Sequence, residues 1–352
     1  MKDLVDILDL TKPEIYELVL TAKDMIANPE KYAEAARGKI LGTLFFEPST
    51  RTRLSFTSAM MSLGGDVLGI SEAASSSVAK GETLSDTIRM VSAYTDIIAI
   101  RHPNEGAATV AARVSSVPVI NAGDGGHHHP TQTLTDLLTI NRLKGRFNKL
   151  TIGICGDLKY GRTVHSLIAA MSRYEDIRFV LISPEELKLP EHVKCDYLDG
   201  KCKYTEVTDL TCEMDKLDVL YMTRVQEERF ASKEEYERLK DVYILTPDKL
   251  ANAKADLAIM HPLPRVNEIA VEIDDDPRAA YFEQAANGRY IRMALILKLL
   301  TEKSRQSSLP TGKEDPTLTC NNPHCVTKTE RGIKSLFSQG RCIYCEHPAE
   351  KK

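Results

Sequence analysis

Short apolar runs alternate with amphipathic stretches along most of the chain. The run at 40–46 is followed by apolar positions at helical spacing between Leu54 and Leu63. Further strands are predicted at 96–100, 117–121, 149–155, 178–182, 218–222, 242–245 and 256–260. Helices are predicted at 11–27, 133–143, 163–174 and 277–300, the last with a candidate break at Asn287-Gly288. This alternation predicts an α/β fold: two doubly wound parallel-sheet domains joined by long helices, plus a small C-terminal module.

These elements predict four parts. Residues 1–145, completed by a C-terminal helix at 285–303, form a first domain, and residues 146–284 form a second. A linker rich in serine and proline, 304–317, leads to a module at 318–352. A chain of 352 residues is long for one hydrophobic core, which favours this division.

Composition describes an ordinary globular protein, with 42% hydrophobic and 27% charged residues. The net charge of -4 gives no general attraction to nucleic acid or to an anionic membrane, so neither is expected as a partner. The N-terminus lacks the apolar region of a signal peptide, and nowhere do 18 apolar residues run together. Eight cysteines without a secretion signal predict a cytoplasmic protein with reduced thiols.

The cysteines form two groups. Cys155, Cys195, Cys202 and Cys212 show no ligand spacing and are predicted to be structural thiols. The other four predict one structural Zn²⁺ per chain, because two pairs at x4 and x2 spacing suit tetrahedral coordination by Cys320, Cys325, Cys342 and Cys345. A module this short cannot bury enough apolar surface to fold without a metal or a disulfide. A disordered tail is disfavoured by a candidate core of Ile333, Leu336, Phe337 and Ile343.

The stretch Ser49-Thr50-Arg51-Thr52-Arg53 links the 40–46 strand to the next helix. Serine or threonine before a helix is usually only a cap, but arginine in a first turn is unfavourable unless an anion joins it. Unpaired first-turn amides, hydroxyls and two arginines therefore predict an anion-binding cradle.

Other polar motifs follow predicted strands. Arg101-His102-Pro103 and residues 123–132 fall at strand carboxyl ends, where open α/β sheets place their ligands. Three arginines at strand ends predict a site for a small dianion: Arg162, Arg224 and Arg265. The loop 71–82 is either a lid or a flexible surface. The run His127-His128-His129 does not predict a metal site, since consecutive residues rarely converge on one ion and no ligand stands at i+4.

Seven motifs occur in this order: Ser49 to Arg53, the loop 76–82 with Lys80, Arg101-His102-Pro103, His129-Pro130-Thr131-Gln132, Lys159-Tyr160-Gly161-Arg162, Arg224-Val225-Gln226 and His261-Pro262-Leu263-Pro264. Together they resemble the catalytic chains of the aspartate carbamoyltransferase family over about residues 1–305. Ornithine carbamoyltransferases are similar in the cradle and the His-Pro-x-Gln element. They typically carry a Ser-Met-Gly loop and a His-Cys-Leu-Pro element, whereas this chain has Arg224-Val225-Gln226 and Leu263 after His261-Pro262.

The resemblance implies transfer of the carbamoyl group of carbamoyl phosphate to the amine of L-aspartate, in de novo pyrimidine biosynthesis. It assigns carbamoyl phosphate to Ser49, Thr50, Arg51, Thr52, Ser76, Arg101, His129, Gln132, Leu263 and Pro264. It assigns aspartate to Lys80, Arg162, Arg224 and Gln226. The residues implied in catalysis are Arg51, Thr52, Lys80, Arg101, His129 and Gln132. No cofactor is expected for the chemistry.

No side-chain general base is predicted. An oxygen of the departing phosphate is expected to accept the amine proton, with His129 as a donor to the carbonyl oxygen. Glu47 is predicted to pair with Arg162 or Arg229 and hold the domains closed.

The resemblance also implies a homotrimer in which Ser76 and Lys80 complete the site of a neighbouring subunit. The cysteine module resembles the zinc domain of the family's regulatory chain, fused here and with a shorter middle spacing. The segment between Leu300 and Cys320 is too short for a nucleotide-binding half, so no ATP or CTP site of the usual kind is expected. Whether the modules join trimers stays open.

Two other classes of function are disfavoured. An inactive scaffold would lack a catalytic residue, and none is missing from the motifs. A zinc-dependent nucleic-acid binder would need a basic face, but the module's Lys328, Arg331, Lys334 and Arg341 are offset by Glu330 and Glu346. A structural or subunit-contact role is therefore favoured for the module.

Overall fold

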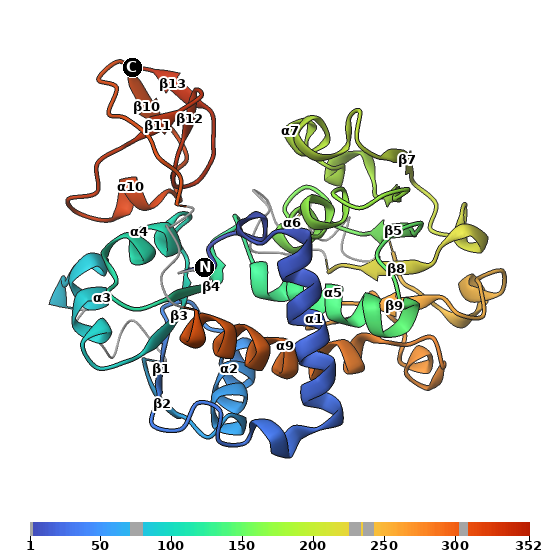
Figure 1. Ribbon diagram of the computed structural model, residues 1–352. Helices are drawn as coiled ribbons and strands as arrows, with labels where there is room; N and C mark the ends of the chain where they lie inside the picture. The colour runs from blue at the N-terminus through green and yellow to red at the C-terminus, as the bar shows by residue number, and fades with distance from the viewer. Residues whose placement is uncertain (1–2, 71–79, 225–233, 235–242, 303–308) are drawn as a thin grey trace. The chain divides into compact units, whose positions relative to one another are not determined.

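The computed structural model describes residues 3–70, 80–224, 234, 243–302 and 309–352 (Figure 1). The chain divides into two compact units, each with its own parallel sheet. Unit 1 comprises Met1–Thr131 and Arg289–Lys352, and unit 2 comprises Gln132–Gly288. In the described part of the chain, no helix is both long enough and apolar enough to cross a membrane.

Unit 1 is built on a four-stranded parallel sheet in the order β2-β1-β3-β4. Its strands are β1 (Ile40–Phe45), β2 (Asp66–Ile70), β3 (Ile97–His102) and β4 (Val119–Asp124). Its helices are α1 (Lys12–Ala27), α2 (Thr50–Ser62), α3 (Leu84–Ser92) and α4 (Ala107–Val114), with short 3-10 turns at Ile7–Asp9 and Pro29–Tyr32. The predicted first helix is confirmed, because Thr11 caps α1 and shares a capping box with Glu14.

Unit 2 carries a five-stranded parallel sheet in the order β7-β6-β5-β8-β9. Its strands are β5 (Thr151–Cys155), β6 (Arg178–Ile182), β7 (Lys203–Val207), β8 (Val219–Met222) and β9 (Ala258–Met260). Its helices are α5 (Pro130–Lys144), which begins in unit 1, α6 (Arg162–Met171), α7 (Glu191–Val193) and α9 (Tyr281–Thr301), which ends in unit 1. Shorter turns lie at Glu185–Leu187, Lys194–Leu198, Met214–Lys216, Pro247–Leu250 and Val271–Asp275.

Several predicted elements need correction. β3 does not end at Ile100 but continues through His102, because the neighbouring strands still pair with it there. The predicted strand 242–245 is wrong over its described residues, where only Leu245 forms a single bridge, to Ile269. α9 starts at Tyr281 and runs unbroken through Asn287, whose side chain donates to Thr139 Oγ1 at 3.0 Å.

The C-terminal module belongs to unit 1 and contains two short antiparallel strand pairs. Its elements are β10 (Leu318–Cys320), α10 (Val326–Thr329), β11 (Phe337–Ser338), β12 (Arg341–Cys342) and β13 (Ala349–Lys351). The predicted module core is confirmed: Phe337 and Ile343 are buried, and Ile333 and Leu336 pack against them.

The module packs against α3 and α4 (Figure 1). Its buried residues share one apolar cluster with Leu84, Ile88 and Ala111 of these helices. Glu105 joins the module as a strand would, since its N–H donates to His324 O and its carbonyl accepts from Val326 N, both at 2.9 Å. The module therefore covers a face of unit 1 that would otherwise be apolar and exposed.

Candidate functional site

The strand-to-helix turn after β1 has the shape expected of an anion cradle. Ser49 is the N-cap of α2 in extended backbone, and the helix places Thr50, Arg51 and Thr52 in its first turn. Ser49 thus occupies the expected cap position, although its side chain forms no capping hydrogen bond. The first turn contains no acidic residue, so its amides and arginine present positive potential to a ligand.

Arg101 lies beside this cradle. It stands opposite Phe45 in the β1–β3 pairing, and its carbonyl accepts from Phe46 N at 2.9 Å. The Arg101 side chain is buried, with Nη2 3.2 Å from Glu47 Oε2. Glu47, predicted to pair with Arg162 or Arg229, thus has an ion pair within its own unit, and Arg229 lies outside the described residues.

Gly123 allows His129 to lie close to Arg101. A Cβ built on this glycine would lie 2.9 Å from Arg101 Nη1 and 3.5 Å from His129 Cδ2. Its φ of +118° is also unfavourable for any other residue. The buried His129 ring and the Arg101 guanidinium therefore flank one glycine at the carboxyl edge of the sheet.

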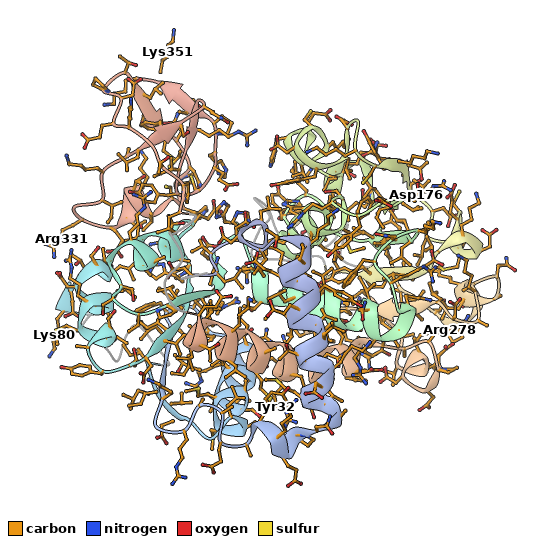
Figure 2. All side chains as sticks on the ribbon, viewed as in Figure 1. Tyr32, Lys80, Asp176, Arg278, Arg331 and Lys351 are labelled. Carbon is orange, nitrogen blue, oxygen red and sulfur yellow. The ribbon has the colours of Figure 1, made fainter. Side chains whose placement is uncertain are left out.

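Ser76 lies outside the described residues, and Lys80 is exposed on the surface of unit 1. Figure 2 shows Lys80 and Arg331 of the module on the same side of this unit. Arg331 donates to the carbonyl of Gly81 at 2.7 Å, so the module contacts the chain directly after Lys80.

His102, next to Arg101, is buried and neutral. Burial lowers the pKa of His102 to about 4, whereas a histidine in the unfolded chain titrates near pH 6.5. Between these values the unfolded state binds more protons, so stability falls as the pH drops from about 6.5 to about 4. We expect the wild type to lose about 3 kcal/mol more than His102→Gln over this range, measured by urea unfolding. Parallel pH profiles for the two proteins would contradict this assignment.

In unit 2, Arg162 is the first residue of α6, after the loop that follows β5, and Arg224 follows the adjacent strand β8. Thr223 holds the two strand ends together: its Oγ1 donates to Cys155 O at 3.0 Å and accepts from Asp157 N at 2.9 Å. The two arginines predicted for a dianion therefore come from one edge of the sheet. Gln226 lies outside the described residues.

Arg265, the third arginine predicted for this dianion, has a different role. Its guanidinium pairs with both carboxylate oxygens of Asp274 and lies over the Tyr281 ring, 5.1 Å from the centroid. This bidentate pair uses the donors that a substrate carboxylate would need, so Arg265 is a structural residue.

Gln132 belongs to a buried hydrogen-bond network that was not predicted from the sequence. Its Nε2 donates to Asp136 Oδ1 at 2.8 Å, and Asp136 also accepts from Gln284 Nε2 at 2.7 Å and Tyr221 Oη at 3.1 Å. Gln284 Oε1 in turn accepts from His261 N at 2.9 Å. The network therefore connects Gln132 to the turn that carries Leu263 and Pro264. A sequence signal existed, since Asp136 is at i+4 from Gln132 on α5.

The turn after β9 is stabilised by two hydrogen bonds of its own residue His261. His261 Nε2 pairs with Glu268 Oε1 at 2.7 Å, and His261 Nδ1 accepts from Leu263 N at 2.8 Å. Leu263 has a φ of +55°, a left-handed conformation that is strained for a side chain of this size, and the peptide bond to Pro264 is cis. His261 thus fixes the backbone carbonyls of this turn.

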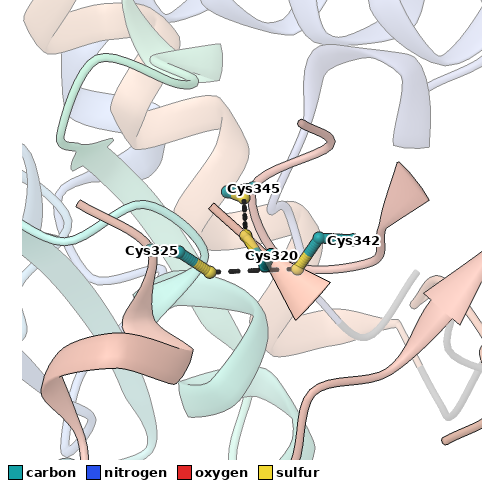
Figure 3. Close-up of side chains that lie close together, drawn as sticks. All are labelled: Cys320, Cys325, Cys342 and Cys345. Atoms are coloured by element: carbon teal, nitrogen blue, oxygen red, sulfur yellow. Dashed lines mark hydrogen bonds between the residues drawn. The ribbon is translucent and has the colours of Figure 1, made fainter. Parts of the chain in front are cut away.

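The four cysteines of the module lie together (Figure 3). The Sγ atoms of Cys320 and Cys345 are 3.5 Å apart, those of Cys325 and Cys342 are 3.8 Å apart, and all four lie within 4.8 Å of one another. Four sulfurs bound tetrahedrally at about 2.3 Å from an ion would be about 3.8 Å apart. All four cysteines are buried and none forms a disulfide, so the cluster fits a tetrahedral metal ion.

Comparisons with known proteins agree on both units. Residues 2–142 match the family described as "Aspartate/ornithine carbamoyltransferase, carbamoyl-P binding domain", and residues 148–299 match "Aspartate/ornithine carbamoyltransferase, Asp/Orn binding domain". An aspartate carbamoyltransferase catalytic subunit of Lachnoclostridium phytofermentans is 62% identical over 301 residues, which are 85% of this chain and 98% of the relative. One from Clostridium acetobutylicum is 61% identical over 300 residues, with the same coverage.

Solved structures of aspartate transcarbamoylases are also similar to this chain. The catalytic subunit of aspartate transcarbamoylase from M. jannaschii has a TM-score of 0.80 and 48% identity, over 85% of this chain and 98% of that one. The enzyme of Trypanosoma cruzi in complex with carbamoyl phosphate and aspartate has a TM-score of 0.81 and 37% identity, over 85% and 97%.

Proposed function

The chain belongs to the aspartate/ornithine carbamoyltransferase family, and we propose that unit 1 holds carbamoyl phosphate while the unit 2 arginines hold L-aspartate. The reaction is that of an aspartate carbamoyltransferase in pyrimidine biosynthesis. The aspartate nitrogen bonds to the carbamoyl carbon, the bond from that carbon to the phosphate oxygen breaks, and N-carbamoyl-L-aspartate and phosphate are released.

In unit 1, the phosphate rests on the first turn of α2, held by Ser49, Thr50 and Arg51. Thr52, Arg101 and His129 donate to the carbonyl oxygen as negative charge develops on it. The approach of Arg101 and His129 to the same side of Gly123 supports this assignment, because both donors can then reach one ligand. Each such fixed donor is worth about 3 kcal/mol of transition-state stabilisation.

Gln132 and the carbonyls around Leu263 and Pro264 orient the carbamoyl amide. Asp136 supports this role for Gln132, since its carboxylate holds the Gln132 amide nitrogen at 2.8 Å and so fixes the direction of the side chain. The amine proton passes to an oxygen of the departing phosphate. His129 then acts as a donor and not as the base.

The choice of aspartate as acceptor rests on a single observation. Arg162, at the start of α6, and Arg224 follow the adjacent strands β5 and β8, whose ends Thr223 ties together. Two guanidinium groups suit the two carboxylates of aspartate, whereas the ammonium group of ornithine would be repelled. Gln226 is proposed to complete this part of the site.

The proposal also covers the domain bounds, the linker and the C-terminal module. Residues 1–145 with 285–303 and residues 146–284 form the two substrate domains, 304–317 is a linker, and the module at 318–352 binds one structural Zn²⁺ through its cysteines. A reducing, cytoplasmic location belongs to the same proposal.

We propose that the active enzyme is a homotrimer in which Ser76 and Lys80 complete the neighbouring site. Arg51→Ala and Lys80→Ala chains are each expected to be nearly inactive alone. Mixed in equal amounts and reassembled, they should recover about a quarter of wild-type activity, because one site in four then combines both intact residues. Reassembly of each variant by itself is the control. No gain on mixing would place both residues in the same chain's site.

A further inference from the structure

Two of the three adjacent histidines do not face the substrate cradle. His127 and His128 meet Glu346, which follows the last cysteine of the module in sequence. His127 Nε2 lies 3.6 Å from Glu346 Oε2, and His128 Nε2 lies 3.6 Å from Glu346 Oε1. The two imidazole rings are tilted by 43° to each other, with centroids 3.7 Å apart. We propose that His127, His128 and Glu346 bind a second divalent transition-metal ion, separate from the four-cysteine site.

The distances fit an ion between these groups better than direct hydrogen bonds. A nitrogen and an oxygen that share a proton lie about 2.7–3.2 Å apart, so 3.6 Å is too long. Ligand atoms at about 2.1 Å from a tetrahedral ion are about 3.4 Å from one another. Both Nε2 atoms are buried, and within the described residues neither makes a hydrogen bond. One ligand atom from each of the three side chains lies within 4.8 Å of the other two.

The second contact of His127 is typical of a metal ligand. Its Nδ1 lies 3.2 Å from Asp124 Oδ2, which leaves Nε2 for an ion. Metal-binding histidines usually donate their other N–H to such a carboxylate. Asp124 is fully buried and fixed, since its two oxygens also accept from Gly106 N, Asn121 Nδ2 and His128 N at 2.9–3.0 Å.

The site has a route for the ion and a candidate fourth ligand. The Glu346 side chain is 48% exposed, so an ion reaches the histidines from solvent past this carboxylate. Asp6 Oδ2 lies 3.7 Å from His128 Nε2. Two imidazoles and carboxylate oxygens form a donor set that suits Zn²⁺ or Co²⁺ better than Mg²⁺ or Ca²⁺.

An ion here would tie together two segments that are far apart in the sequence. Glu346 belongs to the module, whereas His127 and His128 belong to the loop that leads to His129. The sequence did not predict a metal site at this histidine run, because no ligand stands nearby in sequence. The third ligand, Glu346, comes from the module, which packs against the run. The proposal does not depend on the proposed catalytic roles, since it concerns metal content and not turnover.

Metal content of the untagged full chain tests the proposal. After equilibration with excess Zn²⁺ and gel filtration, the wild type is expected to hold about two ions per chain, one of them at the cysteines. The double variant His127→Asn/His128→Gln and the single variant Glu346→Gln are each expected to hold about one. The matched control His192→Asn, an exposed histidine far along the sequence, should keep two.

Co²⁺ substitution separates the sites even if a variant folds poorly. Thiolate-to-cobalt charge-transfer absorption reports the cysteine site, and weaker visible bands report the nitrogen and oxygen site. The double variant should keep the thiolate bands and lose the others. About one ion per chain in the wild type, or an unchanged second equivalent in the double variant, would overturn the proposal and leave the cluster as an ion pair only.

Discussion

Replacing Arg101 with alanine is expected to lower kcat by about 100-fold to 1000-fold. Two effects act in the same direction. The variant lacks a fixed buried donor to the developing charge, and it leaves the Glu47 carboxylate, now 3.2 Å from the guanidinium, without this partner beside a dianionic substrate. Steady-state kinetics with both substrates varied measures the loss.

Two controls make the Arg101 result interpretable. Arg101→Lys keeps the charge but not the planar pair of donors, so its kcat should fall between that of the wild type and that of Arg101→Ala. Arg37→Ala removes an exposed arginine of the same unit, 81% accessible, and should leave the rate unchanged. A folded Arg101→Ala enzyme with kcat within about threefold of wild type would contradict the proposed role.

Replacing Cys342 with serine is expected to unfold the module. Zinc binding contributes about 10–16 kcal/mol to the folding of small zinc modules, which exceeds what the few apolar residues of this one supply. Amide hydrogen exchange should show loss of protection over 318–352. The α4 helix should lose protection too, because Val326 and Tyr344 of the module share its apolar cluster.

The matched control for Cys342 is Cys195→Ser, which changes an exposed cysteine outside the module. It should keep both the bound metal and the exchange pattern of the wild type. A Cys342→Ser protein that retained a full equivalent of metal and a protected module would show that the four cysteines do not act as one site.

Local patterns were sufficient to predict the main architecture and to place the cradle residues on a strand-to-helix turn. A strand, a turn and a helix start are adjacent in sequence, so Ser49 to Thr52 could be placed without knowing any distant contact. The edge strands β2 and β7 were missed because none of their residues is buried and they lack a long apolar run. Such strands are set by pairing with a neighbour and not by their own residues.

Groups whose partners come from elsewhere in the chain were harder to predict. Arg265 looked like a ligand for an anion, yet Asp274 in the following loop already occupies its guanidinium. His127 and His128 looked unsuited to a metal, because Glu346 becomes their neighbour only when the module packs on unit 1. Residue type and spacing therefore predicted where the cradle residues lie, but not which polar groups are satisfied within the protein.

The acceptor specificity of the purified chain tests the central claim most directly. With carbamoyl phosphate in excess, L-aspartate and L-ornithine are compared by measuring carbamoylated product and released phosphate. We predict N-carbamoyl-L-aspartate and phosphate in equal amounts with aspartate, no carbamoylated product with ornithine, and a strongly raised aspartate KM in Arg224→Met. Product from ornithine, or no product from aspartate with a folded enzyme, would contradict the account.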